Sequence, residues 1–273
     1  MSILDAVLLG VLQGIAEFLP ISSSGHLVVA QEVLGISSPG VTFEIMVHAG
    51  TLGSILWYYA SDITNIARGL LRPSQVLPTQ ESSWQWVGWI LLSMIPAMVV
   101  GVGLREPLEE LFENPVWVGG FLMATGLMLL STRWIQVGRS SLSWRKALMM
   151  GLFQALAILP GISRAGSTIT AGLLVGLPRE EAARFSFLMV IPVIGGATLL
   201  ELIDLFQQGG FQQEAGLALS GQIVTLSIGF LTSLVVGLAS LSLLVKLLKQ
   251  NSFHHFGWYC LVIGAAAVAW FIR

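Results

Sequence analysis

The sequence predicts an all-α integral membrane protein with an inverted-topology repeat, built from six transmembrane helices and two re-entrant helical hairpins. Three observations lead to this prediction. Of the 273 residues, 55% are hydrophobic and only 10% are charged, which is typical of membrane proteins. Polar residues recur in two apolar stretches at one fixed spacing. Basic residues gather in alternate loops, as they do in the cytoplasmic loops of membrane proteins.

The first polar stretch begins at Gln13 and reads QGIAEFLPISSSGH. Gln13 and Glu17 are four residues apart, so a helix places both on one face. Pro20 breaks that helix, and the serines after it can cap a new helix whose N-terminus would attract an anion. Because the apolar arms are each shorter than the roughly 20 residues of a spanning helix, we expect a re-entrant hairpin over residues 3–34.

A second polar stretch begins at Gln154 and reads QALAILPGISRAGST. At an offset of 141 residues, the two stretches share a glutamine, a serine and a glycine, which pair Gln13 with Gln154, Ser22 with Ser163 and Gly25 with Gly166. Three other positions differ in chemistry, because Glu17, Ser23 and His26 stand opposite Ile158, Arg164 and Ser167. We therefore expect a second re-entrant hairpin over residues 147–177, with a related backbone and different functional groups.

Six further apolar segments are expected to cross the membrane. They cover residues 43–60, 84–104, 115–134, 183–203, 222–247 and 255–272. The basic connections, expected in the cytoplasm, are 61–83, 134–146 and the turn after Lys246. The acidic or neutral connections, expected outside, are 105–114 and 204–221.

This assignment gives each half of the chain one hairpin and three crossings. An odd number of crossings inverts the second half relative to the first, so the hairpin tips should meet near the midplane of the membrane. We expect a single membrane domain over residues 1–273, with repeat one over 1–134 and repeat two over 147–273. Both termini would then lie outside the cell.

The two tips together predict a site for a phosphorylated group with an apolar tail. A guanidinium forks onto phosphate oxygens, and two helix N-termini add N–H donors. A serine beside a histidine and a carboxylate favours nucleophilic attack, and a carboxylate with phosphate oxygens can share a hard divalent cation. The predicted catalytic residues are Ser23, Glu17, His26 and Arg164. The predicted substrate-binding residues are Ser22, Ser24, Gly25, Ser163, Gly166, Ser167 and Thr168.

The same residues also allow interpretations that involve no catalysis. Glu17 and Arg164 could form a structural ion pair that joins the halves, and hydroxyls in membrane helices often only cap and pack. Glu44 and His48 fit a wall of the site and a solvated face equally well. A transporter or lipid flippase would also suit an inverted repeat with a midplane site. No basic block points to nucleic acid, and the single Cys260 excludes an intrachain disulfide.

The two motifs resemble those of the undecaprenyl-diphosphatase family of the bacitracin-resistance type. QGIAEFLPISSSGH is similar to its (E/Q)xxxE motif and serine-rich tip, and PGISRAGST to PGxSRSGxT, with Ala165 in place of a serine. The resemblance extends over nearly the whole chain, including FEIMVHAG and FSFLMVIP. The positions that match the family's functional residues are Glu17, Ser22, Ser23, His26, Ser163, Arg164 and Thr168. Type-two phosphatidic acid phosphatases share parts of these motifs, but they need a histidine where this chain has Thr170.

The resemblance implies hydrolysis of undecaprenyl diphosphate to undecaprenyl phosphate and inorganic phosphate, which recycles the lipid carrier of cell-wall synthesis. It also implies a divalent cation, Mg²⁺ or Ca²⁺, for which Glu17 and Gln13 are the expected ligands. The expected location is the bacterial cytoplasmic (inner) membrane, with the site open to the outer side. In the expected mechanism Ser23 attacks phosphorus with Glu17 or His26 as base. Direct attack by water and assembly into a homodimer stay open.

Overall fold

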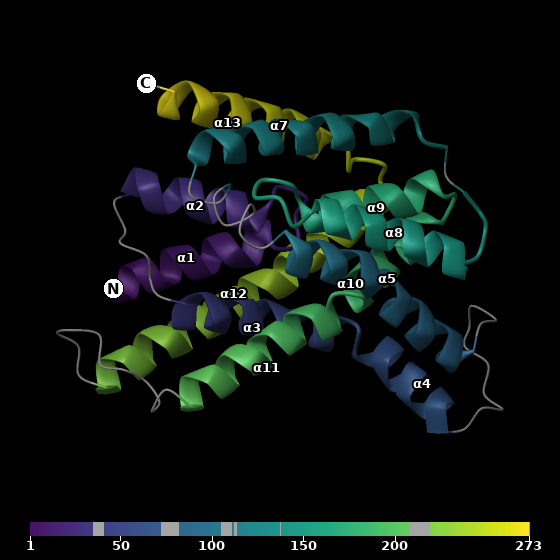
Figure 1. The fold of residues 1–273 in the computed structure, drawn as a ribbon, viewed down its shortest axis with the longest axis horizontal. Coiled ribbons are helices and arrows are strands. Elements are labelled where there is room, and N and C mark those ends of the chain that lie inside the picture. Colours follow the sequence, from purple (N-terminus) through teal and green to yellow (C-terminus); the bar gives the residue numbers. More distant parts are fainter. Residues whose placement is uncertain are drawn as a thin grey trace.

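The computed structural model describes residues 1–34, 41–71, 82–104, 111, 114–136, 138–207 and 219–272, and within these ranges the chain is helical, with no β-strand (Figure 1). Four helical segments in these ranges are long and apolar enough to cross a membrane. They are Ser83–Gly103, Pro115–Trp134, Arg179–Leu200 and Gly221–Lys249. The prediction of an all-α integral membrane protein is therefore confirmed.

Two helical hairpins carry the two polar stretches. The first hairpin consists of α1 (Ile3–Ala16) and α2 (Ser23–Leu34), and the second of α8 (Trp144–Leu156) and α9 (Arg164–Leu174). The outer ends of α1 and α2 lie on the side of the molecule that holds both termini, whereas those of α8 and α9 lie on the opposite side (Figure 1). The two tips thus approach each other from opposite directions and meet inside the molecule.

The remaining helices surround these hairpins. They are α3 (Val41–Tyr58), α4 (Ala60–Leu71), α5 (Ser83–Gly103), α7 (Pro115–Ser131) with the short 3₁₀ helix η1 (Thr132–Trp134), α10 (Arg179–Leu188), α11 (Ile191–Gln207), α12 (Leu219–Lys249) and α13 (His255–Phe271). The expected crossing at 255–272 corresponds to α13, and the one at 43–60 to α3. Neither is among the four apolar spans, because α13 has only 17 residues and α3 carries Glu44 and His48. The count of six crossings stays a prediction.

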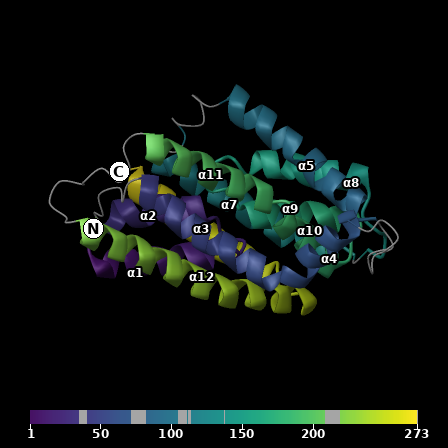
Figure 2. The same cartoon turned by 90° about the horizontal axis from the view of Figure 1, so that it is seen from below.

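Some of the helix packing recurs when the two halves are exchanged, whereas the extensive packing of α3 on α12 has no counterpart of similar extent between the described residues of α5 and those of α10 or α11. In the first half α1 packs on α2 and against α12, and in the second half α8 packs on α9 and against α5. Two further pairs join equivalent helices across the halves: α7 packs on α13 (Figure 1), and α3 packs on α11 (Figure 2). This exchange supports the predicted repeat, whose boundaries stay a prediction.

Glycines allow α7 and α13 to cross closely. A Cβ atom at Gly126 would lie 2.7 Å from the carbonyl oxygen of Gly257, and one at Gly264 would lie 2.6 Å from that of Gly119. Such contact between backbones is the usual role of small residues between membrane helices. The crossing fixes the two helices on which the hairpin tips rest.

The expected crossing at 183–203 overlaps the apolar segment Arg179–Leu200, which consists of two helices. Here α10 ends at Leu188 and α11 begins at Ile191, with a turn at Met189 and Val190. Pro192 causes the break, because it has no N–H to donate to the carbonyl four residues earlier and its ring crowds that carbonyl. The turn lies beside the hairpin tips.

The predicted polar loop at 61–83 also differs from the structure. It begins with α4, in which Ile63 and Ile66 pack against the core while Asp62 forms a 3.2 Å ion pair with Arg184 of α10. Because polar and apolar residues alternate along such an amphipathic helix, its average polarity resembles that of a loop, and the helix was not predicted from the sequence. The two predicted outer loops, at 105–114 and 204–221, lie largely outside the described residues.

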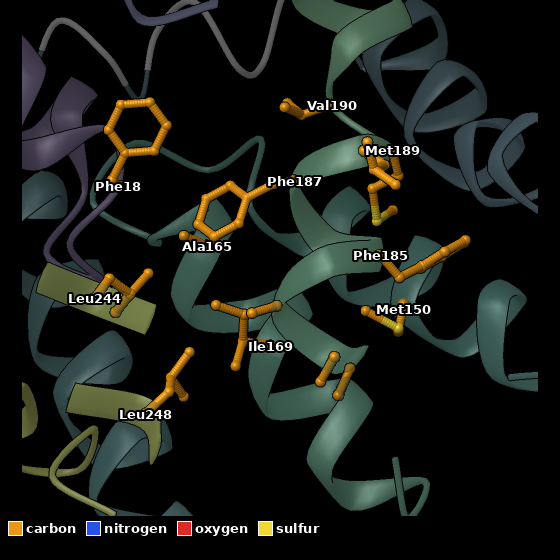
Figure 3. Packing of buried hydrophobic residues seen from close by; sticks show 14 of the residues in the cluster. Phe18, Met150, Ala165, Ile169, Phe185, Phe187, Met189, Val190, Leu244 and Leu248 are labelled. Atoms are coloured by element: carbon orange, nitrogen blue, oxygen red, sulfur yellow. The ribbon is translucent and has the colours of Figure 1, made fainter. Parts of the chain in front are cut away.

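The hydrophobic core includes side chains from both hairpins, such as Phe18 and Ala165, packed with side chains of α10 (Figure 3). Its aromatic centre is the pair of Phe18, from the first tip, and Phe187, from α10, with ring centroids 5.7 Å apart. Ala165, the residue that departs from the serine of the second motif, is buried in this cluster. A serine at this position would place a hydroxyl among apolar side chains, so the alanine suits its surroundings.

Candidate active site

The second arm of each hairpin begins after a serine whose hydroxyl accepts from a glycine N–H three residues on, although φ is 70° at Ser22 and −72° at Ser163. Ser22 Oγ accepts a hydrogen bond from the backbone N–H of Gly25 at 3.3 Å, and Ser163 Oγ accepts one from Gly166 at 3.1 Å. The prediction that Ser22 caps α2 is confirmed, and Ser163 repeats it in α9. The two caps fix the positions of Ser23 and Arg164, which each follow a cap directly.

A buried ion pair joins the two tips. Arg164 Nη2 lies 2.5 Å from Glu17 Oε1, and the two side chains are 16% and 8% exposed. Glu17 Oε2 accepts hydrogen bonds from Ser23 Oγ at 2.9 Å and from Gln13 Nε2 at 3.2 Å. A buried carboxylate is tolerated when its oxygens are paired in this way. The structure thus brings together Glu17, Ser23 and Arg164. The Glu17–Arg164 ion pair, which the sequence also allowed as a purely structural contact between the two halves, is present.

Arg164 keeps one donor unused. Its guanidinium carbon lies 5.9 Å from the centre of the Phe187 ring, over the face of an aromatic side chain. Its Nη1 is buried and finds no hydrogen-bond partner among the described residues. A buried unpaired guanidinium N–H is costly, and an anion bound beside it would satisfy it.

Two cavities meet at the ion pair. The smaller, the tip cavity, has a volume of about 90 Å³ and is lined by Ala16, Glu17, Ser22, Ser23, Ser24, Ala157, Ile162, Ser163 and Arg164. The larger, the groove, has a volume of about 600 Å³ and continues from Glu17 and Arg164 along α5 and α11. Its walls are mainly apolar, and they include Met94, Met98, Val193 and Leu200. A polar cavity joined to an apolar groove suits an amphiphilic ligand.

His26 faces away from the tip cavity. Its Nδ1 lies 3.0 Å from the carbonyl oxygen of Ser22, and its Nε2 lies 2.9 Å from the hydroxyl of Tyr259, on which the ring stacks. Because a carbonyl only accepts, Nδ1 donates this bond, and Nε2 pairs with the Tyr259 hydroxyl. The structure therefore places Glu17, not His26, against Ser23. The catalytic role of His26 stays a prediction.

The other predicted binding residues mostly shape the tips. Ser24 Oγ lies 3.3 Å from Ser22 Oγ and lines the tip cavity. Thr168 Oγ1 donates to the carbonyl of Arg164 at 2.9 Å and lies 2.5 Å from the hydroxyl of Ser186, so it anchors the first turn of α9. Ser167 is buried, and its hydroxyl lacks a partner within the described ranges.

The two glycines of the motifs permit close packing. A Cβ at Gly25 would lie 3.1 Å from the Cα of Gly161, in the opposite tip, and one at Gly166 would lie 3.1 Å from the Cβ of Ser163. Gly161 itself has a φ of 99°, which favours glycine. Gly25 therefore allows the two tips to approach each other closely, and Gly166 allows Ser163 to pack over the first turn of α9; the binding roles of both glycines stay predictions.

Three residues of the site are absent from the predicted catalytic and substrate-binding residues, although two of them were named from the sequence, His48 as a possible wall of the site and Gln154 as the repeat match of Gln13. Thr125 of α7 holds the second tip, since its hydroxyl donates to the carbonyl of Gly161 at 2.9 Å and accepts from the N–H of Ser163 at 3.1 Å. His48 and Gln154 line the groove beside the ion pair. The repeat match of Gln154 with Gln13 is a signal that could have identified Gln154. Nothing in the apolar sequence around Thr125 marks it.

Comparisons with known proteins agree on one family. The sequence profile described as "Bacitracin resistance protein BacA" matches residues 6–266. Among curated relatives, the undecaprenyl-diphosphatase of Desulfatibacillum aliphaticivorans is 38% identical over 279 residues, which cover 97% of each chain. The enzyme of the same name from Methanosphaera stadtmanae is 36% identical over 285 residues, and that from Geobacter metallireducens is 38% identical over 273 residues, with 98% of each chain covered in both cases.

Proposed function

This chain belongs to the bacitracin resistance protein BacA family, and on that basis we propose that it is a membrane-bound undecaprenyl-diphosphatase. It hydrolyses undecaprenyl diphosphate to undecaprenyl phosphate and inorganic phosphate. The observation that carries the proposal is the meeting of Ser23, Glu17 and Arg164 at the junction of a polar cavity and an apolar groove. The names of the relatives support a hydrolase over a transporter or flippase.

In the proposed first step Ser23 Oγ attacks the terminal phosphorus. Glu17, whose Oε2 accepts the Ser23 hydrogen bond, takes the proton, and the new bond joins Oγ to phosphorus. The bond from phosphorus to the bridging oxygen breaks, and the prenyl monophosphate leaves with that oxygen and receives the proton. Water then hydrolyses the phosphoserine with Glu17 again as base, and inorganic phosphate is released.

Arg164 stabilises the charge that develops on the phosphoryl oxygens. Its unpaired Nη1 is available to a phosphate, and turning Nη2 from Glu17 to the substrate frees the carboxylate to act as a base. The N-termini of α2 and α9 add backbone N–H groups at the same place. Direct attack by water, activated by Glu17, uses the same groups without a covalent intermediate.

A divalent cation fits this donor set in part. Gln13 Oε1 is buried and lacks a hydrogen-bond partner in the described part of the chain, and it lies on the same side chain whose Nε2 donates to Glu17. An amide oxygen and a carboxylate are ligands of the kind that Mg²⁺ and Ca²⁺ prefer, with substrate oxygens and water completing the shell. When bound, the cation would neutralise charge on the diphosphate. The described residues include no cluster of three His, Cys, Asp or Glu side chains that could hold a metal without the substrate.

We further propose that the protein lies in the bacterial cytoplasmic membrane with its site open to the outer side. Single cysteines test this orientation, because the native Cys260 is buried. Cysteines at Glu110 and Gln213, outside the described residues, should react with an impermeant reagent from outside, and one at Ser140 only from the cytoplasm. Reaction of all three from one side would exclude the inverted repeat.

The activity is tested with purified protein in detergent. With Mg²⁺ or Ca²⁺ present, we expect inorganic phosphate and prenyl monophosphate in equal amounts from farnesyl or undecaprenyl diphosphate. Chelation by EDTA should suppress the release. Well-folded protein that releases no phosphate from either substrate, with any divalent cation, would exclude the proposed function.

A further inference from the structure

Gln154 is a buried amide with no partner for either of its polar atoms. It is 5% exposed, and both Oε1 and Nε2 lack hydrogen bonds within the described residues. The matching Gln13 donates instead to Glu17. The second tip has Ile158 where the first has Glu17, so the partner that would satisfy Gln154 in its own hairpin is missing. Each unsatisfied buried group of this kind calls for an explanation.

The position of Gln154 suggests one. It lines the groove together with Glu17, His48 and Arg164, at the polar end of an otherwise apolar channel. The unpaired Nη1 of Arg164 is a second buried donor at this end. Two orphan donors beside an open channel are satisfied together by a ligand with several acceptor oxygens.

The two cavities differ in size and lining, so each would hold a different phosphate of a bound diphosphate. The tip cavity, of about 90 Å³, is much smaller than the groove, of about 600 Å³, so it suits the small polar end of the substrate. It contains Ser23, so it receives the terminal phosphate. The phosphate linked to the prenyl chain must then lie beyond the Glu17–Arg164 pair, in the groove of about 600 Å³, where Gln154 is located.

We propose that Gln154 is a substrate-contact residue for the prenyl-linked phosphate and a determinant of selectivity for diphosphates over monophosphates. Its Nε2 donates to an oxygen of that phosphate, and the prenyl chain follows the apolar walls of α5 and α11. A prenyl monophosphate held by the same contacts keeps its phosphate in the groove, away from Ser23, and so binds without reacting. This inference rests on the proposed function.

The test replaces the amide with an apolar side chain of similar length, Gln154→Met. We expect the KM for farnesyl diphosphate to rise about tenfold or more, since hydrogen bonds to charged groups are among the stronger ones, while kcat changes less. Inhibition by farnesyl monophosphate should weaken by a similar factor, and the ratio of diphosphate to monophosphate hydrolysis should fall. Replacing an unsatisfied buried amide with an apolar group should not lower Tm.

Thr170→Val is the matched control. Thr170 is buried on α9 and its hydroxyl also lacks a partner in the described chain, but it lines neither cavity. The control should leave KM, kcat and product inhibition unchanged.

Unchanged KM and unchanged product inhibition in Gln154→Met would overturn the inference, as would a large loss of Tm, which would show that the fold itself satisfies the amide. If the unaltered protein releases no phosphate, the proposed function is wrong. If it releases phosphate but Gln154→Met behaves like the unaltered protein, the proposed function stands and only the role of Gln154 is wrong.

Discussion

The two hairpin tips share a serine cap, but they differ in backbone conformation, with a positive φ at Ser22 in one and at Gly161 in the other, and in the groups that they present. Each has a serine cap that accepts from a glycine N–H, at 3.3 Å from Ser22 and at 3.1 Å from Ser163. The residue after the cap is Ser23 in the first tip and Arg164 in the second, and the two point into one cavity. The repeat thus provides the same kind of helix cap in both tips, with a hydroxyl and a carboxylate in the first tip and a cation in the second.

The tips are also held differently. Thr125 of α7 binds the second tip through two buried hydrogen bonds. The first tip is held by α13, where Tyr259 bonds His26 and the Cys260 thiol lies 3.6 Å from the carbonyl oxygen of Pro20. Since α7 and α13 cross through glycines, the relative position of the tips is set by that crossing. The comparison indicates that neither hairpin is a complete site alone.

The largest expected effect concerns the hydroxyl of the first tip. Ser23→Ala should lower turnover by roughly three orders of magnitude or more, because it removes the nucleophile while the phosphate contacts stay. Ser24→Ala should keep substantial activity, and Ser22→Ala should fall between them through loss of the cap. Phosphate release by the three variants measures this order. A wild-type rate for Ser23→Ala would exclude the covalent route and favour water activated by Glu17.

The equivalent position of the second tip should give the next largest effect. Arg164→Lys keeps the charge but loses the fork that can span two phosphate oxygens, so we expect turnover to fall by roughly 10²- to 10³-fold. Steady-state kinetics with farnesyl diphosphate measure the loss. Activity close to that of the unaltered protein would remove Arg164 from the phosphate site.

A smaller effect is expected from the residues that hold the tips. Thr125→Val removes both hydrogen bonds to the second tip and leaves a buried carbonyl and N–H unpaired, which should cost about 1–3 kcal/mol of stability and part of the activity. Tyr259→Phe removes one bond at a more exposed site and should cost less. Thermal unfolding and phosphate release measure both. Equal losses of stability in the two variants would contradict the inference that the second tip is bound more strongly to its neighbouring helix than the first tip is.

Local sequence signals predicted the hairpins well. The arms, the breaks at the tips, the Ser22 cap and the meeting of Glu17 with Arg164 all follow from short motifs, from the offset of 141 residues and from the charge of the loops. These features depend on neighbours in the chain. The family resemblance added the substrate and the reaction.

Contacts between distant helices could not be predicted in the same way. The engagement of His26 by Tyr259 and the hold of Thr125 on Gly161 join residues that no periodicity or motif connects. The break between α10 and α11 depended on Pro192, whose effect in a membrane helix varies with the neighbours that satisfy the freed carbonyls. Gln154 was visible in the repeat, but its lack of a partner required the packed structure.

The carboxylate of Glu17 in one tip and the guanidinium of Arg164 in the other form one buried pair, and a double-mutant cycle on stability measures how strongly they depend on each other. Glu17→Gln and Arg164→Met should each cost about 3–5 kcal/mol, because each leaves its partner's charge buried and unpaired. The double variant should be no less stable than either single variant, so the coupling energy should be about 3 kcal/mol or more. Additive losses of unfolding free energy in the double variant would show that the two charges do not depend on each other.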